Sequence, residues 1–241
     1  MLKIEECLSP NLPHCGMLCD SKISKSLTKY PCIDEMWNKN SATAVIGKPG
    51  QGKSSWMYSL MASVLRKKFH NVFVFIPSAS IHSMADPIYT TLPSDQVYDD
   101  LTEENLGYVL DRVKNEDKKF RSLIIFDDQS AHLKSNKEVL KMLKELLFNR
   151  RHYGVSIFFL VQTWYSIPRE IRRSFSGLVL FKASKDEIRT IFDEVVEGKS
   201  KWRDQISDLV FTEPHKYLCV NLLNQNMFDG FNRIIFPDDN I

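Results

Sequence analysis

The 241-residue sequence has little of what marks membrane, secreted or disordered proteins. Its longest nearly apolar run, residues 155–161, has seven residues, whereas a bilayer span needs about 20. The amino-terminal MLKIEECLSP has acids and a proline where a secretory signal has a long apolar stretch, so we expect no export and five reduced cysteines. With 43% apolar and 26% charged residues, the chain has the composition of one globular domain with a sizeable core.

A strong excess of either charge is also absent, because the formal net charge is only +2. That value alone argues against a dedicated polyanion binder. The charge is unevenly distributed, however: residues 95–117 hold eight acids against two bases, and residues 141–203 hold 13 bases against seven acids. The two segments are either two solvated faces or an acidic segment beside a basic functional region.

Hydrophobic patterning predicts an amino-terminal arm over residues 1–40 and a single domain over 41–241. The arm contains prolines, little apolar periodicity and one short helix near 33–38. In the domain, runs rich in β-branched and aromatic residues alternate with segments of helical period, which indicates an α/β fold with a mostly parallel central sheet flanked by helices on both faces. The predicted strands are 42–46, 72–76, 123–126, 156–161, 177–181, 217–221 and 233–236, and the predicted helices are 55–68, 102–114, 137–151 and 185–197.

The segment GKPGQGKS, residues 47–54, matches the P-loop pattern G-x-x-x-x-G-K-[ST] between a predicted strand and a predicted helix. Its glycines let successive N–H groups turn toward phosphate, and the helix adds its positive dipole end. Lys53 would reach the β- and γ-phosphates of ATP, and the Ser54 hydroxyl would bind Mg²⁺. The predicted nucleotide-binding residues are Gly47, Lys48, Pro49, Gly50, Gln51, Gly52, Lys53, Ser54 and Ser55.

Two carboxylates end the predicted strand 123–126. Asp127 is placed to hold Mg²⁺ together with Ser54, and Asp128 to act as the base that activates the attacking water. Both residues could instead simply terminate the strand. The P-loop upstream favours the catalytic interpretation, although kinases that phosphorylate small acceptors also use a P-loop.

Three further blocks carry a resemblance to a known family: LIIFDD (123–128), NRRHYGVSIFFLVQT (149–163) and KDEIRTIFDE (185–194). With the P-loop, they resemble the FtsK and HerA superfamily of DNA-pumping ATPases, and most of all its genome-packaging branch from large DNA viruses and virophages. The spacing of Arg151, Gly154 and Gln162 matches the family pattern. The resemblance implies a RecA-like (ASCE) P-loop ATPase that forms a homo-oligomeric ring, a pentamer or hexamer, and uses ATP and Mg²⁺.

The same resemblance implies packaging of double-stranded viral DNA, gripped without sequence specificity, into a preformed capsid. The implied partners are the duplex and a capsid or portal-vertex protein, and the implied location is the host cytoplasm, in a virus factory, or the virion. Two alternatives stay open. One is a cellular or plasmid translocase of the same superfamily, and the other is a nucleotide-gated capsid or membrane scaffold that does not move DNA.

By resemblance, Gln162 is the sensor of the γ-phosphate, and Arg151 is the arginine finger that enters the neighbouring subunit's site. The alternative for Gln162 is a polar strand end. The alternative for Arg151 is a helix-end base favoured by the helix dipole, with Arg150 equally eligible as the finger. Cellular members typically have Glu where this sequence has Asp128, so the attacking water would sit nearer the strand here.

Basic residues in the loops after two predicted strands are candidates for contacts with DNA phosphates. For those after the second strand, an exposed helical face or an inter-subunit contact is an equally good explanation. Cysteines and His14 in the arm have a possible zinc-ligand spacing but no paired C-x₂-C knuckle, which favours unpaired small apolar cysteines. The DNA-contact candidates are Lys134, Lys137, Arg169, Arg172 and Arg173.

Overall fold

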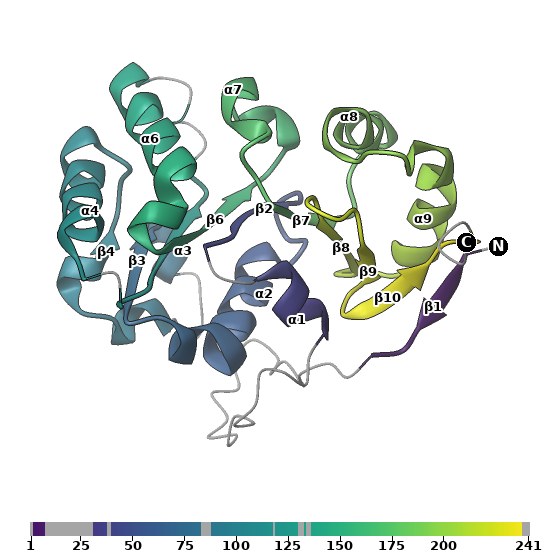
Figure 1. The fold of residues 1–241 in the computed structure, drawn as a ribbon, viewed down its shortest axis with the longest axis horizontal. Helices are drawn as coiled ribbons and strands as arrows, with labels where there is room; N and C mark the ends of the chain where they lie inside the picture. Colours follow the sequence, from purple (N-terminus) through teal and green to yellow (C-terminus); the bar gives the residue numbers. More distant parts are fainter. Residues whose placement is uncertain are drawn as a thin grey trace.

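A computed structural model of the chain describes residues 2–7, 31–37, 40–82, 88–117, 119–129, 133 and 136–237. They form a ten-stranded sheet with helices on both faces, in the strand order β1-β10-β9-β8-β7-β2-β6-β5-β3-β4 (Figure 1). The strands are β1 (Lys3–Glu5), β2 (Ala42–Ile46), β3 (Asn71–Phe75), β4 (Val97–Tyr98), β5 (Ser122–Asp127), β6 (Val155–Val161), β7 (Gly177–Phe181), β8 (Tyr217–Asn221), β9 (Met227–Asp229) and β10 (Asn232–Ile235).

One part of the sheet, from β7 to β4 in the strand order, is entirely parallel. Every residue of β2, β5, β6 and β7 is buried, because helices cover both faces. That burial explains why the sequence shows continuous apolar runs here instead of alternation. β6 lies between β2 and β5, so it separates the strand that enters the P-loop from the strand that ends at Asp127. The predicted α/β fold with a mostly parallel sheet is confirmed.

The other part of the sheet is antiparallel and runs from β8 through β9 and β10 to β1. The sequence predicts β8 and most of β10, but neither β9 nor β1. Residues 3–5 pair with residues 233–235, so an amino-terminal segment lies beside a carboxyl-terminal one. Helix α1 (Pro31–Met36) contributes Ile33 and Met36 to the core. The described segments of the first 40 residues therefore join the sheet and its core.

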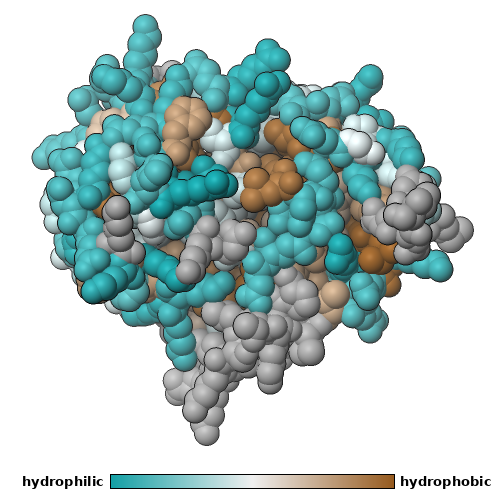
Figure 2. Space-filling model, in the orientation of Figure 1, coloured by the Kyte–Doolittle hydropathy of each residue, from teal (hydrophilic) through white to brown (hydrophobic). Residues whose placement is uncertain are grey.

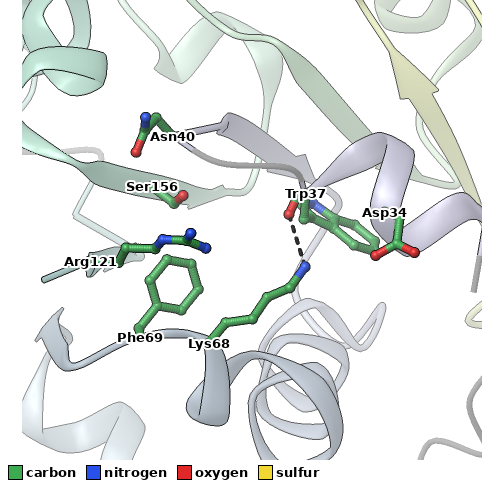
Figure 3. A pocket seen from close by; sticks show the side chains of 7 residues that line it. All are labelled: Asp34, Trp37, Asn40, Lys68, Phe69, Arg121 and Ser156. Atoms are coloured by element: carbon green, nitrogen blue, oxygen red, sulfur yellow. Dashed lines mark hydrogen bonds between the residues drawn. The ribbon is translucent and has the colours of Figure 1, made fainter. Parts of the chain in front are cut away.

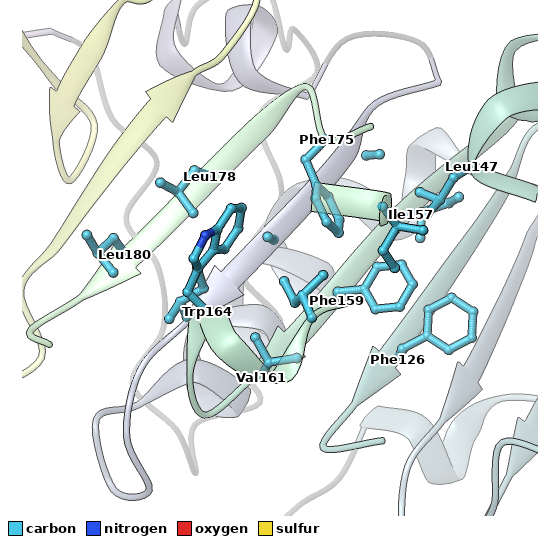
Figure 4. Packing of buried hydrophobic residues seen from close by; sticks show 14 of the residues in the cluster. Phe126, Leu147, Ile157, Phe159, Val161, Trp164, Phe175, Leu178 and Leu180 are labelled. Atoms are coloured by element: carbon cyan, nitrogen blue, oxygen red, sulfur yellow. The ribbon is translucent and has the colours of Figure 1, made fainter. Parts of the chain in front are cut away.

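The sheet separates the apolar interior into two clusters, one packed between the sheet and the helices on each face. Successive strand residues alternate between them: Ala44 belongs to the first cluster and Val45 to the second. In the first cluster, Phe126 and Phe159 stack with ring centroids 4.5 Å apart (Figure 4). This face is covered by α4 (Glu103–Asn115), α6 (Lys137–Tyr153), α7 (Arg169–Arg172), α8 (Lys185–Val195) and α9 (Arg203–Val210). The opposite face is covered by α1, α2 (Lys53–Leu60), α3 (Ser78–His82) and the helical turns that follow α2.

The predicted helix 55–68 begins earlier, at Lys53, and changes its winding along its length. The α-helical part ends at Leu60, a π-helical turn covers Met61–Leu65, and a 3₁₀ turn covers Arg66–Lys68. Further 3₁₀ turns cover Ile88–Thr91, Ser94–Gln96, Trp164–Ser166 and Ser200–Trp202. No helix in the described ranges is both long and apolar enough to cross a membrane.

Candidate active site

The predicted catalytic residues meet at one edge of the parallel sheet, where its strands end. Gly47 follows β2, Asp127 closes β5 and Gln162 follows β6. The strand register aligns these ends, because Ile46 pairs with Val161 and Asp127 with Leu160. In open α/β sheets, ligands bind outside this carboxyl edge. We call it the strand-end edge, and the opposite one the strand-start edge.

The loop of residues 47–52 has the backbone conformation that phosphate binding needs. Gly50 and Gly52 have φ values of +77° and +95°, which only glycine adopts readily. Helix α2 begins directly after Gly52 with no side-chain cap, so its first N–H groups are available to an anion. At Gly47, an added Cβ would lie 2.8 Å from the Phe181 Cβ, so β7 packs against the start of the loop. The local geometry fits a phosphate cradle.

Lys53 lies beneath this loop, next to the two carboxylates. Its Nζ donates a hydrogen bond to the Lys48 carbonyl oxygen at 3.2 Å. Burial lowers the pKa of Lys53, while the charges of Asp127 and Asp128 act in the opposite direction. The Lys53 ammonium is therefore hydrogen-bonded to a backbone carbonyl, which a phosphate oxygen could replace, and it lies close to both carboxylates.

Asp127 has the properties of a metal-binding carboxylate. Its side chain is 2% exposed, and its Oδ2 has no hydrogen-bond partner in the described part of the chain. Burial raises the pKa of Asp127 to about 6, against the lowering effects of the hydrogen bond from Ser54 and the charge of Lys53. A Ser hydroxyl beside a carboxylate with a free oxygen fits Mg²⁺, which binds through one or two protein oxygens, phosphates and water.

Asp128 and Gln162 form a second pair at the same edge. Asp128 has a φ of +54°, so the chain turns sharply after β5 and this carboxylate is exposed while Asp127 is buried. Gln162 Nε2 donates to Asp128 Oδ1 and Oδ2 at 3.1 and 3.3 Å. The Asp128 N–H also donates to the Leu160 carbonyl oxygen at 3.1 Å, which fixes the turn to β6. The two residues predicted to act on the attacking water are thus in direct contact.

The two candidate finger residues lie at the strand-start edge, at the end of α6. Arg150 is half-buried, and it donates from Nε to the Asn40 carbonyl oxygen at 3.0 Å and from Nη1 to the Leu147 carbonyl oxygen at 2.7 Å. Arg151 is exposed. Both precede β6, whereas Gln162 follows it, and a seven-residue strand spans about 20 Å. The fold therefore separates Arg151 from the Asp127 carboxylate of its own chain.

The candidate DNA-contact residues differ in their surroundings. Lys137, Arg169 and Arg173 are exposed, and Lys134 lies outside the described residues. Arg172 is 8% exposed, and it donates from Nη1 to both Glu194 carboxylate oxygens at 2.9 Å. Its guanidinium also lies over the Trp164 ring. Arg172 holds the end of α7 against α8 and is not available to a duplex in this structure.

Two residues near the site were missed by sequence reasoning. His215, with a φ of +65°, places Nδ1 3.1 Å from the Gln51 carbonyl oxygen, against the P-loop. Tyr89 is fully buried, and its hydroxyl has no hydrogen-bond partner among the described residues. Burial, and then the charge of Asp127, raises the pKa of Tyr89. Neither residue belongs to a local motif. Only the folded chain brings them to the site.

Solved structures share this fold at low sequence identity. The genome packaging NTPase B204 of Sulfolobus turreted icosahedral virus 2, in complex with ATP-gammaS, superposes with a TM-score of 0.63 at 16% identity, over 82% of this chain and 98% of that one. B204 of Sulfolobus turreted icosahedral virus, described as the DNA-packaging ATPase, gives 0.61 at 16% identity, over 83% and 99% of the two chains. The cytoplasmic domain of the Type VII secretion ATPase EccC of Thermomonospora curvata gives 0.51 at 13% identity, over 81% and 23%.

No curated protein matches the sequence. A family model described as "Poxvirus A32 protein" matches residues 32–236, which include the P-loop, both carboxylates, Gln162 and the end of α6. This match covers most of the described chain, from α1 to the end of the sheet. The chain belongs to the poxvirus A32 protein family.

Proposed function

We propose that this protein is an ATP-driven translocase that packages double-stranded viral DNA into a preformed capsid. The observation that carries the proposal is the meeting of Lys53, Ser54, Asp127, Asp128 and Gln162 at one sheet edge, in a chain of the poxvirus A32 protein family. The B204 chains, described as genome-packaging or DNA-packaging enzymes, have the same fold, which supports packaging over other P-loop reactions.

Hydrolysis would take place at the strand-end edge. The backbone of residues 47–55 binds the triphosphate, and Lys53 moves from the Lys48 carbonyl to the β- and γ-phosphate oxygens. Ser54 and Asp127 would hold Mg²⁺, which would supply positive charge that offsets the negative charge of the phosphates. Asp128 accepts a proton from the attacking water, and Gln162, already bonded to Asp128, orients that water and responds to the loss of the γ-phosphate.

Arg151 would complete the site of a neighbouring subunit. It is exposed, it lies about 20 Å from its own strand-end edge, and its neighbour Arg150 is occupied by two backbone carbonyls. An arginine at the transition state adds roughly 10³- to 10⁵-fold in rate. A finger that cannot reach its own nucleotide requires a head-to-tail arrangement, which supports a closed homo-oligomeric ring.

Exposed lysine and arginine side chains after β5 and β6 would hold duplex DNA by its phosphates. Among the described residues the candidates are Lys137, Arg169 and Arg173. Lys134 lies outside the described residues and stays a candidate on its sequence position alone. Arg172 is left out because its charge is neutralised by Glu194. Such contacts carry no sequence information, as a motor that moves a whole genome requires. A capsid or portal-vertex partner and a location in the host cytoplasm or virion follow from this role.

Two measurements test the proposal. Duplex DNA at low salt should stimulate ATP hydrolysis severalfold, and stimulation should fall as salt rises. A nucleotide-gated scaffold that does not move DNA would show no such stimulation. In the second measurement, Lys53→Ala subunits are mixed with Arg151→Ala subunits, each inactive alone. Partial recovery of hydrolysis supports a shared site, whereas no recovery over a range of mixing ratios contradicts a finger acting across subunits.

A further inference from the structure

A cavity at the strand-start edge lies at the opposite side of the sheet from the nucleotide site. It encloses about 210 Å³ and is formed where α1, the 3₁₀ turn after α2 and the first residues of β5 and β6 come together. Asn40, Lys68, Arg121 and Ser156 surround it, with Trp37 and Phe69 as apolar walls (Figure 3). Of the residues around it, only Ser156 belongs to a block discussed above (149–163), and none is a predicted catalytic, nucleotide-binding or DNA-contact residue.

The cavity has more positive than negative charge. Arg121 is half-buried and has no ion pair among the described residues. The nearby Glu116 is engaged elsewhere, since its two oxygens accept from Asn71 Nδ2 and the Ser122 hydroxyl. Lys68 donates to the Trp37 carbonyl oxygen at 3.3 Å, and Asp34 is the single lining carboxylate. The charged side chains that line the cavity are therefore two cations, Lys68 and Arg121, and one carboxylate, Asp34.

The other polar groups around the cavity are also free to donate hydrogen bonds. Ser156 is 2% exposed and lines the cavity, and its hydroxyl has no hydrogen-bond partner in the described part of the chain. The side-chain amide of Asn40 is likewise without a partner there, and Asn40 itself has a φ of +62°. An acceptor in the cavity would give the Ser156 hydroxyl a hydrogen-bond partner.

We propose that this cavity is a binding site for a small oxyanion of the phosphate class. The guanidinium of Arg121, the ammonium of Lys68, the Ser156 hydroxyl and the Asn40 amide can all donate, and the anionic oxygens of phosphate accept such bonds. One of these donors, Ser156, is 2% exposed and lies within the cavity, which favours a small free anion over the backbone of a rigid duplex. Anion binding here does not depend on the proposed packaging function, whereas its effect on Arg151 rests on that proposal.

An anion bound here would act on the end of α6. The Asn40 carbonyl accepts the Arg150 Nε hydrogen bond at 3.0 Å, and Arg151 is the next residue. Donation from the Asn40 side chain to the anion would fix the turn that holds Arg150. Occupancy would therefore order the helix end that presents Arg151.

The test is binding of inorganic phosphate, followed by ³¹P NMR, to the full chain carrying Lys53→Ala, which weakens phosphate binding in the P-loop. We expect saturable binding in this background and an at least tenfold weaker affinity when Arg121→Gln is added. Ser156→Ala, which leaves the charges in place and is small enough for the strand, should weaken binding severalfold. The matched control is Lys67→Gln, an exposed cation beside Lys68 in the same turn, which should leave the affinity unchanged.

Three results would overturn the proposal: no saturable binding in the Lys53→Ala chain, an equal loss of affinity in the Lys67→Gln control, or displacement of phosphate by a short DNA duplex that depends on Arg121. Melting temperatures of all variants are measured without phosphate, so that a misfolded variant is recognised. Because the readout is binding in a chain with a disabled P-loop, a negative result leaves the packaging function untouched, and loss of DNA-stimulated hydrolysis leaves this site untouched.

Discussion

The two edges of the parallel sheet differ in their chemistry. At the strand-end edge, two carboxylates, a lysine and a glutamine contact one another around a glycine loop. At the strand-start edge, arginines and a donor-lined cavity lie near one another without a nucleotide loop. The comparison teaches that the two ends of β6, about 20 Å apart, carry unlike chemistry, with carboxylates and a glycine loop at one end and cationic donors at the other.

The largest expected effect is at the strand-end edge. Lys53→Ala should reduce ATP hydrolysis below detection and weaken ATP binding strongly, because the ammonium is the P-loop charge that reaches the β- and γ-phosphates. Hydrolysis is measured as phosphate release, and binding by fluorescence of a labelled nucleotide. Lys182→Ala, an exposed lysine just after β7 at the same edge, is the control and should retain activity. Equal losses in both variants would mean that only the general positive charge matters.

The next effect tests the strand-start edge. Arg151→Ala should lower kcat by roughly 10³-fold while nucleotide binding stays near normal, because a finger acts on charge that develops in the transition state. Steady-state kinetics and equilibrium nucleotide binding are measured on the same preparation. Hydrolysis at the parental rate would show that Arg151 takes no part in the reaction. The strand-start edge would then have no role in hydrolysis at the strand-end edge.

Asp127→Asn separates activity from stability. Hydrolysis should be lost with the metal-binding carboxylate, yet the nucleotide-free protein should become more stable at pH 7 by about 3 kcal/mol, the equivalent of raising an Asp pKa from 3.8 to about 6. Burial raises the pKa of Asp127, so ionising this carboxyl destabilises the folded protein. Between pH 4 and pH 6 the unfolded chain releases this proton more readily than the folded one, so the contribution of Asp127 to stability falls as pH rises through that window.

Denaturant unfolding at pH 4.5 and pH 7, in the absence of nucleotide and metal, measures this contribution. The parent should lose stability relative to Asp127→Asn as the pH is raised. Parallel pH dependence of the two proteins would show that the buried carboxylate is already compensated in the folded state.

The smallest effect distinguishes the two adjacent arginines. Arg150→Ala should cost about 1–2 kcal/mol of unfolding free energy, because it removes two hydrogen bonds from a charged donor to backbone carbonyls. Its effect on kcat should be far smaller than that of Arg151→Ala. Thermal unfolding and kcat are compared for the pair, and the reverse pattern would make Arg150 the finger.

The sequence predicted those elements and site residues whose signal lies in neighbouring residues of the chain. The P-loop, the strand that ends at Asp127 and the helix that Gly154 ends, with a φ of +69°, are each encoded within one continuous stretch of chain. Arg172 was misjudged as a DNA contact because its partner, Glu194, comes from the next long helix. β1, His215 and the cavity depend on contacts across most of the chain, which no local pattern reports.

Strand β6 has a mechanical consequence. All seven of its residues are buried, and it is hydrogen-bonded to β2 on one side and β5 on the other, so the sheet holds it along its whole length. One end continues into Gln162 and the other begins just after Arg151. In a ring, a push delivered at one end when the γ-phosphate leaves would arrive at the next subunit's nucleotide. The order in which subunits hydrolyse ATP would then depend on this single strand.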